Sequence, residues 1–482
     1  MHIGLVARIL ALLVLLVCAF MLAPIFFAFY HGELTVLPAF LLPMGAVAAG
    51  AVLILFLTRR CRRNLSARDG FLLVTLSWLV CALLGALPFA LSGAIPRYVD
   101  AFFETMSGFT TTGASILTDI EALPKSMLFW RSLTHWLGGM GIIVLTVALF
   151  PLLGIGAYRL MKAEAPGPTL DKIAPRITQM AKILWFIYLS FTVAEAALLM
   201  IAGMNLFDAL THTFGTLATG GFSPKALSVG HYGSAAVDSI ITVFMLLAGL
   251  NFGLYYALVT GQARRVFTNL EMKVYLGIFA VATTTIALVL FRRQFDGFWT
   301  SLRYAGFQSA SILTTTGFTT ADYAAWPPMT RVILFGLMFV GGCSGSTGGG
   351  IKVIRIVSLW RLGLNEMKLL ARPQGVFSLR LGQQTLKKDI VYSIGGFFFL
   401  YVLVLLATTL VIGSGGNDIL TSFSGALVTV GNIGPGFGRI GPTHNYAFLP
   451  AYVKWYLGFA MLAGRLEIYT VLMLLTPGFW RD

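Results

Sequence analysis

Nine stretches of the chain are apolar for roughly 20 residues each, the length that a helix needs to cross a bilayer. They are residues 5–30, 37–57, 70–92, 128–152, 177–201, 237–260, 274–291, 390–412 and 447–475. Only 11% of the 482 residues are charged, against about 25% in an ordinary soluble domain. The sequence therefore predicts an integral membrane protein. It excludes a cytosolic enzyme, a disordered scaffold, a coiled coil and a disulfide-stapled secreted domain.

Lysine and arginine are concentrated in alternate connecting segments. Segments 59–68, 159–182, 264–273 and 352–388 hold 21 of them, whereas 97–131, 225, 292–331 and 439–454 hold 10. Because cytoplasmic loops collect Lys and Arg, we expect the first set and the N-terminus to face the cytoplasm. Segment 292–331, with four arginines, fits this orientation least well. Attraction to anionic lipid would also account for the net charge of +15.

One further crossing is predicted to be broken near the middle of the membrane. Residues 329–340 are apolar, but a 12-residue helix is only about 18 Å long. The glycine-rich run Gly341–Gly350 follows, and a second moderately apolar run covers residues 351–364. Irregular backbone at this depth is tolerated only where it is buried in protein or lines water. A plain helix kink is the alternative explanation.

Four segments of the chain resemble one another, and each lies between two apolar stretches. They are residues 103–115, 212–223, 308–319 and 424–437, and each contains a Thr/Gly core. The cores align on Gly113, Gly220, Gly317 and Gly434, with Gly431 as the second choice in the fourth. The spacing is about 100 residues. We therefore expect an all-α membrane protein of four helix–pore loop–helix units around a central pore, with two additional N-terminal helices.

These repeats give predicted unit boundaries. Residues 1–69 form the two N-terminal transmembrane helices, and the four pore units cover 70–174, 175–272, 273–387 and 388–482.

Four such loops can converge on one axis. Glycine permits positive φ, so successive carbonyl groups can point the same way. Rings of backbone carbonyls replace the hydration shell of an ion, and the C-termini of the short helices before them carry negative partial charge. None of the four cores contains Asp or Glu. The pattern favours a cation pathway. Glycine-mediated helix packing would explain one such motif, but not four at regular spacing.

With these motifs the chain resembles the Trk/Ktr/HKT superfamily of potassium transporters, and most closely its bacterial Trk potassium-uptake branch. The resemblance covers the whole chain. It rests on Thr-Thr-Thr-Gly at 110–113 and 314–317, Ala-Thr-Gly-Gly at 218–221, Asn-Ile-Gly-Pro-Gly at 432–436, His-Trp-Leu-Gly-Gly-Met-Gly at 135–141, and the run 341–350.

The resemblance implies potassium uptake across the bacterial inner membrane, with K⁺ as the bound ion and no cofactor in this chain. Glycine at position 113 is the residue that goes with potassium, whereas serine there goes with sodium in some plant members. It also implies a homodimer and a cytosolic TrkA-like ring of regulatory subunits that binds a nucleotide, either ATP/ADP or NAD. The implied potassium-binding residues are Thr111, Thr112, Gly113, Ala218, Thr219, Gly220, Thr315, Thr316, Gly317, Asn432, Ile433 and Gly434. The implied gate consists of Gly341, Gly342, Cys343, Ser344, Gly345, Ser346, Thr347, Gly348, Gly349, Gly350 and Arg465.

Several charged residues have two interpretations. Arg465 either lies near the pore beneath the loops or extends to the inner interface. Glu104 and Asp208 either attract cations at the outer mouth or cap short helices. His135 and His212 are expected to be packing residues. Glu195 and Glu467 are the carboxyl groups that proton- or sodium-coupled symport would use, so coupled transport is the alternative to a passive pore. A membrane-embedded enzyme is disfavoured because no His, Asp or Cys residues cluster at membrane depth.

Overall fold

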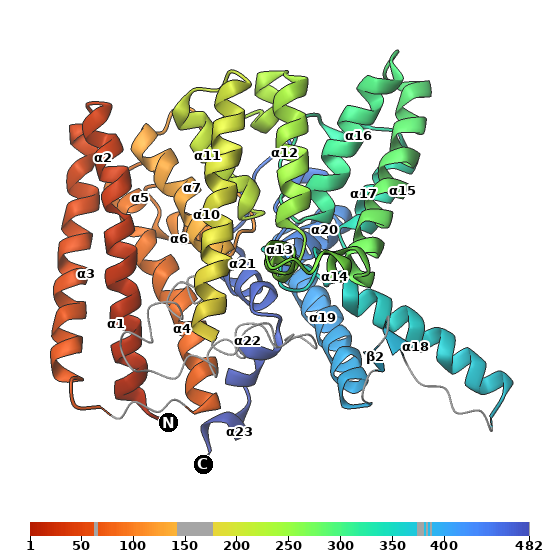
Figure 1. Ribbon diagram of the computed structural model, residues 1–482. Helices are drawn as coiled ribbons and strands as arrows, with labels where there is room; N and C mark the ends of the chain where they lie inside the picture. The colour runs from red at the N-terminus through yellow and green to blue at the C-terminus, as the bar shows by residue number, and fades with distance from the viewer. Residues whose placement is uncertain (62–65, 142–176, 374–379, 382–383, 386–387, 482) are drawn as a thin grey trace.

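The computed structural model describes residues 1–61, 66–141, 177–373, 380–381, 384–385 and 388–481. The chain forms a bundle of helices whose long members run in roughly the same direction, and both termini lie at one end of it (Figure 1). This end is called the termini side below. The fold prediction of an all-helical membrane protein is confirmed, since the described part contains only one pair of two-residue strands.

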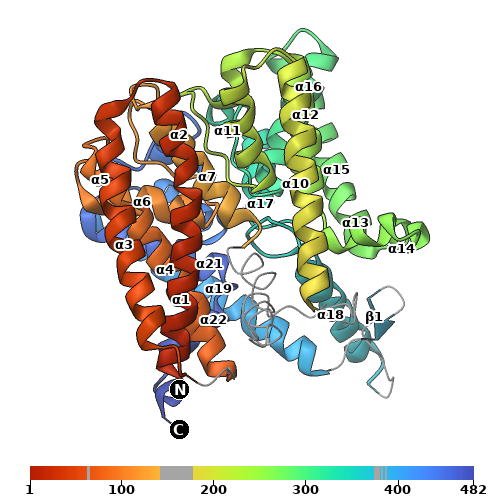
Figure 2. The same ribbon diagram turned by 60° about the vertical axis from the view of Figure 1, so that its left-hand side comes forward.

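The N-terminal segment forms two helical crossings that pack against the first unit (Figure 2). Its elements are α1 (Ile3–Phe20), α2 (Leu22–Tyr30), η1 (Leu34–Val36) and α3 (Leu37–Leu57). Phe27 of α2 stacks on Phe129 of the first unit, with 4.1 Å between ring centroids. The Glu33 carboxylate accepts hydrogen bonds from the backbone N–H groups of Lys125 and Ser126, at 2.7 and 3.0 Å. It thereby caps a helix N-terminus that would otherwise leave its donors unpaired.

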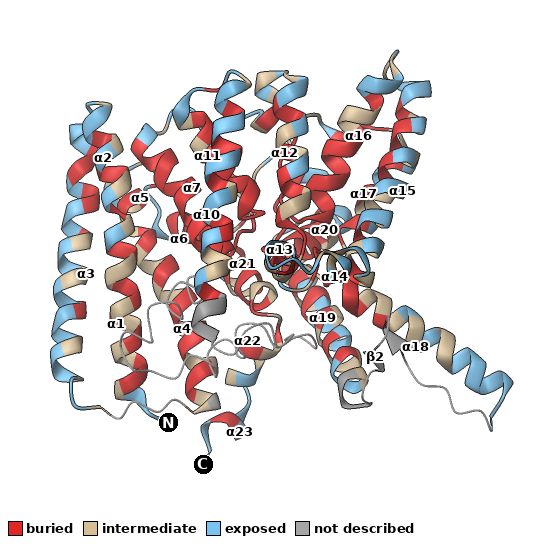
Figure 3. Cartoon of the chain, in the orientation of Figure 1, coloured by how far each residue is buried: buried red, intermediate tan, exposed pale blue. Residues whose placement is uncertain are grey.

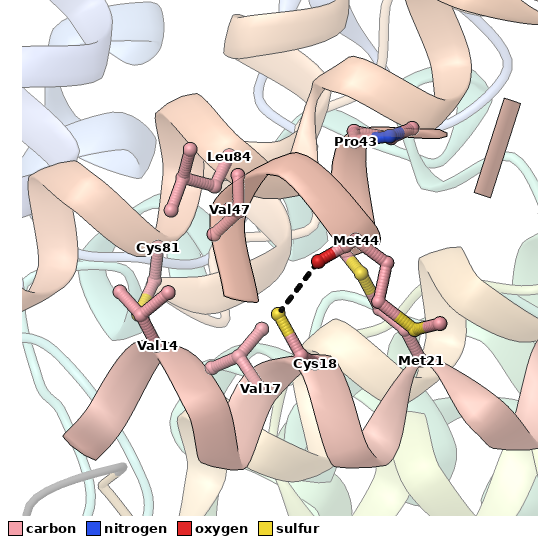
Figure 4. Close-up of a pocket in the computed structure, with 9 residues that line it drawn as sticks. All are labelled: Val14, Val17, Cys18, Met21, Pro43, Met44, Val47, Cys81 and Leu84. Carbon is pink, nitrogen blue, oxygen red and sulfur yellow. Dashed lines mark hydrogen bonds between the residues drawn. The ribbon is translucent and has the colours of Figure 1, made fainter. Parts of the chain in front are cut away.

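A small apolar cavity of about 10 Å³ lies where α1 and α3 meet the next helix (Figure 4). Cys18 and Cys81 line it together with Met21 and Met44. All four cysteines of the chain lie in the described ranges, and each is a free thiol. This cavity is a packing gap between the N-terminal crossings and the first unit.

Each of the four repeated units has a first helix, a short helix that ends inside the bundle, and a second helix. The first unit contains α4 (Ala67–Gly85), α5 (Leu87–Leu91), α6 (Tyr98–Phe109) and α7 (Lys125–Gly139). The second contains α10 (Ile177–Ile201), α11 (Leu206–Leu217), η3 (Ser228–Tyr232), α12 (Ala235–Ala248), α13 (Phe252–Val259) and α14 (Ala263–Phe267).

The third and fourth units follow the same plan. The third contains α15 (Leu270–Arg293), α16 (Phe298–Leu313), η4 (Tyr323–Ala325), α17 (Pro328–Leu337) and α18 (Val353–Ala371), followed by strands β1 (Arg380–Leu381) and β2 (Gln384–Thr385). The fourth contains α19 (Lys388–Ser414), α20 (Ile419–Val430), η5 (Gly438–Ile440), α21 (Ala451–Arg465), α22 (Tyr469–Leu474) and α23 (Pro477–Trp480).

The short helices α6, α11, α16 and α20 occupy the core of the bundle (Figure 3). Every residue of α6 from Asp100 to Phe109 is buried. Two of these helices begin with a side-chain cap: Asn205 accepts from the backbone N–H of Asp208, and Asp418 from that of Thr421. The hydrogen bonds from Thr421 lower the pKa of Asp418. These caps satisfy backbone N–H groups of the first turn, which have no partner within the helix.

The four units close into a ring, because each second helix packs on the short helix of the next unit. Aromatic pairs mark three of these junctions: Phe129–Phe214 at 5.7 Å, Phe335–Phe423 at 6.0 Å and Phe102–Trp455 at 4.3 Å between centroids. At the remaining junction, α12 packs on α16. The Phe102–Trp455 pair joins unit four back to unit one.

The second helices do not run straight across the bundle. Helices α12 and α13 meet at a 90° bend, and three residues separate the end of α21 from the start of α22. The sequence predicted one continuous helix at 237–260 and another at 447–475, and both predictions are wrong because each stretch is broken into two helices. In both places the break coincides with glycine (Gly249 and Gly464). The predicted break after residue 340 is confirmed, because α17 ends at Leu337 and α18 begins at Val353.

Six described helices or helix pairs are long and apolar enough to cross a bilayer, or seven with α12–α13 as one span. The C-terminal part of the predicted crossing 128–152, most of basic segment 159–182 and the predicted unit boundary at 174 lie outside the described residues. Helix α18 leaves the bundle on the termini side (Figure 1).

Candidate functional site

Four loops with the same backbone conformation follow the four short helices. Thr111, Thr219, Thr315 and Asn432 stand at matching positions, and their φ angles are +53°, +53°, +61° and +54°. The left-handed region is unfavourable for a β-branched residue such as threonine. Its appearance at three threonines and an asparagine in corresponding positions shows that the geometry is imposed by the repeated fold.

Two residues further along, each loop has a glycine that also has positive φ. The four are Gly113, Gly221, Gly317 and Gly434, with φ of +78°, +78°, +81° and +94°. The second loop therefore differs from the predicted register by one residue. Gly221, rather than Gly220, corresponds to Gly113. The sequence Thr-Gly-Gly offered two glycines, and only the backbone angles distinguish them. In the fourth loop Gly434 holds this position, whereas Gly431 ends helix α20.

These four glycines make the loops converge, because each glycine lies against a carbonyl of the next loop. A Cβ atom at Gly113 would collide with the carbonyl oxygen of Gly220, one at Gly221 with Thr316, and one at Gly317 with Ile433. A Cβ atom at Gly434 would lie 2.6 Å from the carbonyl oxygen of Thr112, which closes the circle. The carbonyl oxygens of residues 112, 220, 316 and 433 thus form a ring, and any side chain at the glycine positions would disrupt it.

The predicted site residues occupy three successive positions in each loop. Thr111, Thr219, Thr315 and Asn432 have the left-handed backbone, while Thr112, Gly220, Thr316 and Ile433 supply the carbonyl ring. Gly113, Gly317 and Gly434 are the packed glycines, joined by Gly221. Ala218 ends helix α11 one residue before the loop. All of the short helices point their C-terminal ends at this ring, and those ends carry negative partial charge.

The segment 341–350, here called the glycine segment, lies directly against the loops on their termini side. The backbone N–H of Gly349 donates to Thr315 Oγ1 at 2.7 Å. Thr347 Oγ1 is 3.4 Å from Thr219 Oγ1. A Cβ atom at Gly349 would lie 2.5 Å from the carbonyl oxygen of Gly431. The glycine segment therefore contacts the second, third and fourth loops or the helix ends beside them.

The bend between α12 and α13 holds the glycine segment in place. Cys343 N–H donates to the carbonyl oxygen of Gly249 at 2.8 Å, and Thr347 Oγ1 donates to that of Ala248 at 3.2 Å. Phe252 N–H donates to the carbonyl oxygen of Gly345 at 2.9 Å. The break thus exposes backbone groups for which the glycine segment supplies the partners.

Arg465, the last residue of α21, connects the glycine segment to the first unit. Its Nη1 donates to the carbonyl oxygen of Thr347 at 2.7 Å, and its Nη2 donates to those of Gly138 and Gly139 at 2.9 and 3.2 Å. Gly138 and Gly139 end helix α7. The side chain therefore points into the bundle beneath the loops, and the interpretation that it extends to the interface is wrong.

Two further cations hold the residues that follow the glycine segment. Lys352 Nζ donates to the carbonyl oxygen of Gly348, and Arg355 forms an ion pair with Glu467. Glu467 and Ile468 have φ of +56° and +63°, between α21 and α22. A left-handed isoleucine is strained, so the surrounding contacts must stabilise this break.

The sequence interpretation missed Glu271, which binds both the first half of the glycine segment and the start of α18. Its Oε1 accepts from the backbone N–H of Ser344 at 2.7 Å and of Ile354 at 3.2 Å. The side chain is buried, in the first turn of α15. In the sequence, an acidic residue in a first helical turn is explained by the helix dipole alone, so nothing there indicates this role.

The remaining candidates are buried. Glu104 is buried and pairs with Arg131, so of its two interpretations the one as a cation attractor at the outer mouth is wrong. Asp208 lies beside its cap residue Asn205. Glu195 is buried on α10. Within the described ranges, no group of three or more His, Cys, Asp or Glu residues could hold a metal ion.

Comparisons with known proteins agree with this architecture. The profile of the TrkH family, described as "Cation transport protein", matches residues 44–478. The chain is 42% identical to the Trk system potassium uptake protein TrkH of Salmonella typhimurium, and 41% identical to that of Escherichia coli, over the full length of both chains in each case. The crystal structure of the potassium transporter TrkH from Vibrio parahaemolyticus matches with a TM-score of 0.89, at 38% identity and full coverage of both chains.

A ring of four helix–loop–helix units in an apolar bundle defines a membrane transport protein. More particularly, the chain belongs to the TrkH family of cation transport proteins. Since this is a family of transporters, the interpretation as a membrane-embedded enzyme is excluded.

The anchoring by Glu271 can be tested directly. We expect Glu271→Ala to speed hydrogen exchange at the amides of Ser344 and Ile354 by about tenfold or more, because a hydrogen bond to a charged group contributes roughly 1.5–3 kcal/mol. Hydrogen–deuterium exchange mass spectrometry of peptides covering 341–354 measures this. Glu366→Ala, which removes an exposed carboxylate from α18, is the matched control. Equal exchange in both variants would show that Glu271 does not hold the glycine segment.

Proposed function

We propose that the protein takes up potassium across the bacterial inner membrane through a pore whose selectivity filter is the ring of carbonyl oxygens. The observation that carries the proposal is the closed circle of glycine–carbonyl contacts among the four loops. Each contact brings one backbone oxygen against a glycine of the neighbouring loop, which supports a ring of four oxygens around one axis. Such a ring replaces the water around a cation. The relatives from Salmonella typhimurium and Escherichia coli are named potassium uptake proteins.

The glycine segment is proposed as the gate of this pore. It contacts the loops from the termini side, through Gly349 and Thr347. Backbone hydrogen bonds also join it to the α12–α13 bend, and the Arg465 guanidinium adds a positive charge beneath the ring. A cation that passes the ring meets this segment and this charge next. Both oppose its passage until the segment moves.

The remaining parts of the proposal concern orientation and partners. The termini side is assigned to the cytoplasm because the ends of α3 and α4 beside Arg59, Arg60 and Arg68, and the basic helix α18, lie there. A homodimer and a cytosolic TrkA-like nucleotide-binding ring are the assembly that the resemblance implies. Helix α18, which leaves the bundle on the termini side with basic and apolar residues exposed, supports a contact surface there.

Proton- or sodium-coupled symport is the second candidate, and the buried carboxyl group of Glu195 supports it. Intramembrane carboxyl groups are typical of coupled transporters. Glu467, the other candidate for coupling, is already paired with Arg355. This pairing favours the passive pathway.

The deciding experiment is uptake of ⁸⁶Rb⁺ into liposomes that contain the purified protein, with a potassium gradient and no proton or sodium gradient. We expect uptake that K⁺ inhibits and Na⁺ does not. The assay is repeated with the cytosolic partner, since the gate of the isolated protein can be closed. Uptake that requires a proton or sodium gradient, with or without the partner, would instead establish coupled transport.

Gly113→Ser tests the ring. The new Cβ would collide with the carbonyl oxygen of Gly220 at a residue whose φ is +78°, so we expect the preference for K⁺ over Na⁺ to fall. Ion competition against ⁸⁶Rb⁺ uptake measures it. Gly93→Ser is the matched control, because Gly93 has a similar φ of +75° but open space around it. An unchanged preference in a folded Gly113→Ser protein would contradict the filter assignment.

Deletion of residues 344–349 tests the gate. Removal of this obstruction should raise ⁸⁶Rb⁺ uptake in the absence of the cytosolic partner. Thr347→Val should raise it to a smaller extent, because it removes the hydroxyl that contacts Thr219 and Ala248. Thr347→Ser retains that hydroxyl and is the control. Lower uptake by a deletion variant that still elutes as a folded protein would mean that the segment is not a barrier.

A further inference from the structure

A chain of buried polar contacts lies behind the first two loops. Glu104 Oε1 accepts from Arg131 Nε at 2.6 Å and from Ser115 Oγ at 2.9 Å, and Glu104 Oε2 accepts from the backbone N–H of Ile116 at 2.9 Å. The Glu104 and Arg131 side chains are 0% and 3% exposed. Glu104 therefore binds the extended segment that follows the first loop.

Arg131 continues the chain into the second unit. Its Nη1 donates to the carbonyl oxygen of Ser223 at 3.0 Å, and its guanidinium lies 3.6 Å from the centroid of the Phe222 ring. A guanidinium on an aromatic face gains a cation–π attraction that increases when water is absent. Arg131, on α7, thus connects Glu104 to the segment that follows the second loop.

His212 completes the chain from the opposite side. Its Nδ1 donates to the carbonyl oxygen of Asp208 at 2.7 Å, which leaves Nε2 to accept from Ser223 Oγ at 3.0 Å. The contacts therefore run without interruption from helix α6, through Glu104, Arg131, Ser223 and His212, to helix α11.

The other two units use neutral groups for the same purpose. Gln308 of α16 contacts Thr320 Oγ1 at 3.4 Å, and Ser424 of α20 donates to the carbonyl oxygen of Phe437 at 3.0 Å. Ser311 of α16 also donates to the carbonyl oxygen of Phe318 at 2.6 Å, and Thr421 of α20 accepts from the backbone N–H of Arg439 at 3.1 Å. Each short helix thus holds the segment after its own loop through polar side chains. Among the described residues, the first unit alone holds the segment after its own loop with an ion pair, and Arg131 of that pair also contacts the segment after the second loop.

We propose that the Glu104–Arg131 pair is a positioning device that sets the separation of the first two loops, and thereby the preference for one cation over another. Ser115 and Ser223 stand three residues after Thr112 and Gly220, whose carbonyl oxygens belong to the ring. The pair therefore holds both segments at positions equally far along the chain, three residues, from their ring carbonyls. Both charges are buried, so loss of either partner would leave the other uncompensated, which opposes separation of the pair. This inference rests on the proposed filter.

The test compares three variants in the ⁸⁶Rb⁺ uptake assay, with competition by K⁺ and by Na⁺. Arg131→Lys keeps the charge but loses the planar fork that reaches Glu104 and Ser223 together. Ser115→Ala removes one hydrogen bond to Glu104 and leaves the pair intact. Asp238→Asn is the control. It removes the ion pair between Asp238 on α12 and Arg303 on α16, and the polar contacts of Arg303 are with Asp238 and Tyr304 rather than with a loop segment.

We expect the K⁺ over Na⁺ preference to fall about tenfold in Arg131→Lys, the equivalent of roughly 1.4 kcal/mol. A smaller fall is expected in Ser115→Ala, and none in Asp238→Asn. Unchanged preference in Ser115→Ala and Arg131→Lys, with only a lower melting temperature, would show that the pair stabilises the fold and does not set selectivity. If Arg131→Lys does not fold, Ser115→Ala decides alone. A wild-type protein with no preference for K⁺ would refute the proposed filter itself, and this inference with it.

Discussion

The contact of each loop glycine with a carbonyl oxygen of the next loop is the constraint on which the rest of the structure depends. Four such contacts close a circle, so no loop can shift without displacing its neighbour. The circle also requires left-handed backbone at Thr111, Thr219, Thr315 and Asn432, each at a cost of about 1–3 kcal/mol. The surrounding helices must offset that strain. The burial of α6 from Asp100 to Phe109 and the packing of each second helix on the next short helix do so.

The breaks in the second helices follow from hydrogen bonding beneath this circle. A helix that ends inside a bundle leaves carbonyl groups unpaired, and hydrocarbon cannot satisfy them. Here the carbonyls of Gly138, Ala248 and Gly249 are satisfied by Arg465 and by the glycine segment. If the glycine segment moves, these groups need new partners, and water in the opened space is the available one. In the proposed mechanism, opening and hydration of the pathway are therefore one event.

The sequence predicted the features that repeat and missed those that depend on single contacts. The apolar stretches, the four Thr/Gly cores and the break after residue 340 all follow from pattern and spacing, and they defined the fold. The register of the second loop could not be predicted from the pattern, because Gly220 and Gly221 are equivalent in sequence. The 90° bend at Gly249 was missed because glycine is common in straight membrane helices. The partner of Glu104 was not foreseen, and Glu271 was overlooked, because their partners, Arg131 and Ser344, are distant in sequence.

The four units share a backbone but not the side chains around it, and this difference has a structural consequence. A ring made from four identical chains would carry four copies of every feature, and four ten-residue glycine segments would compete for the space beneath one axis. In a single chain the segment occurs in the third unit, while the second supplies its carbonyl partners and the fourth supplies Arg465. The first unit, which contributes only the end of α7 to these contacts, holds its loop with the Glu104–Arg131 pair. Divergence of the repeats thus allows one side of the ring to stay fixed while the other carries the part that is proposed to move.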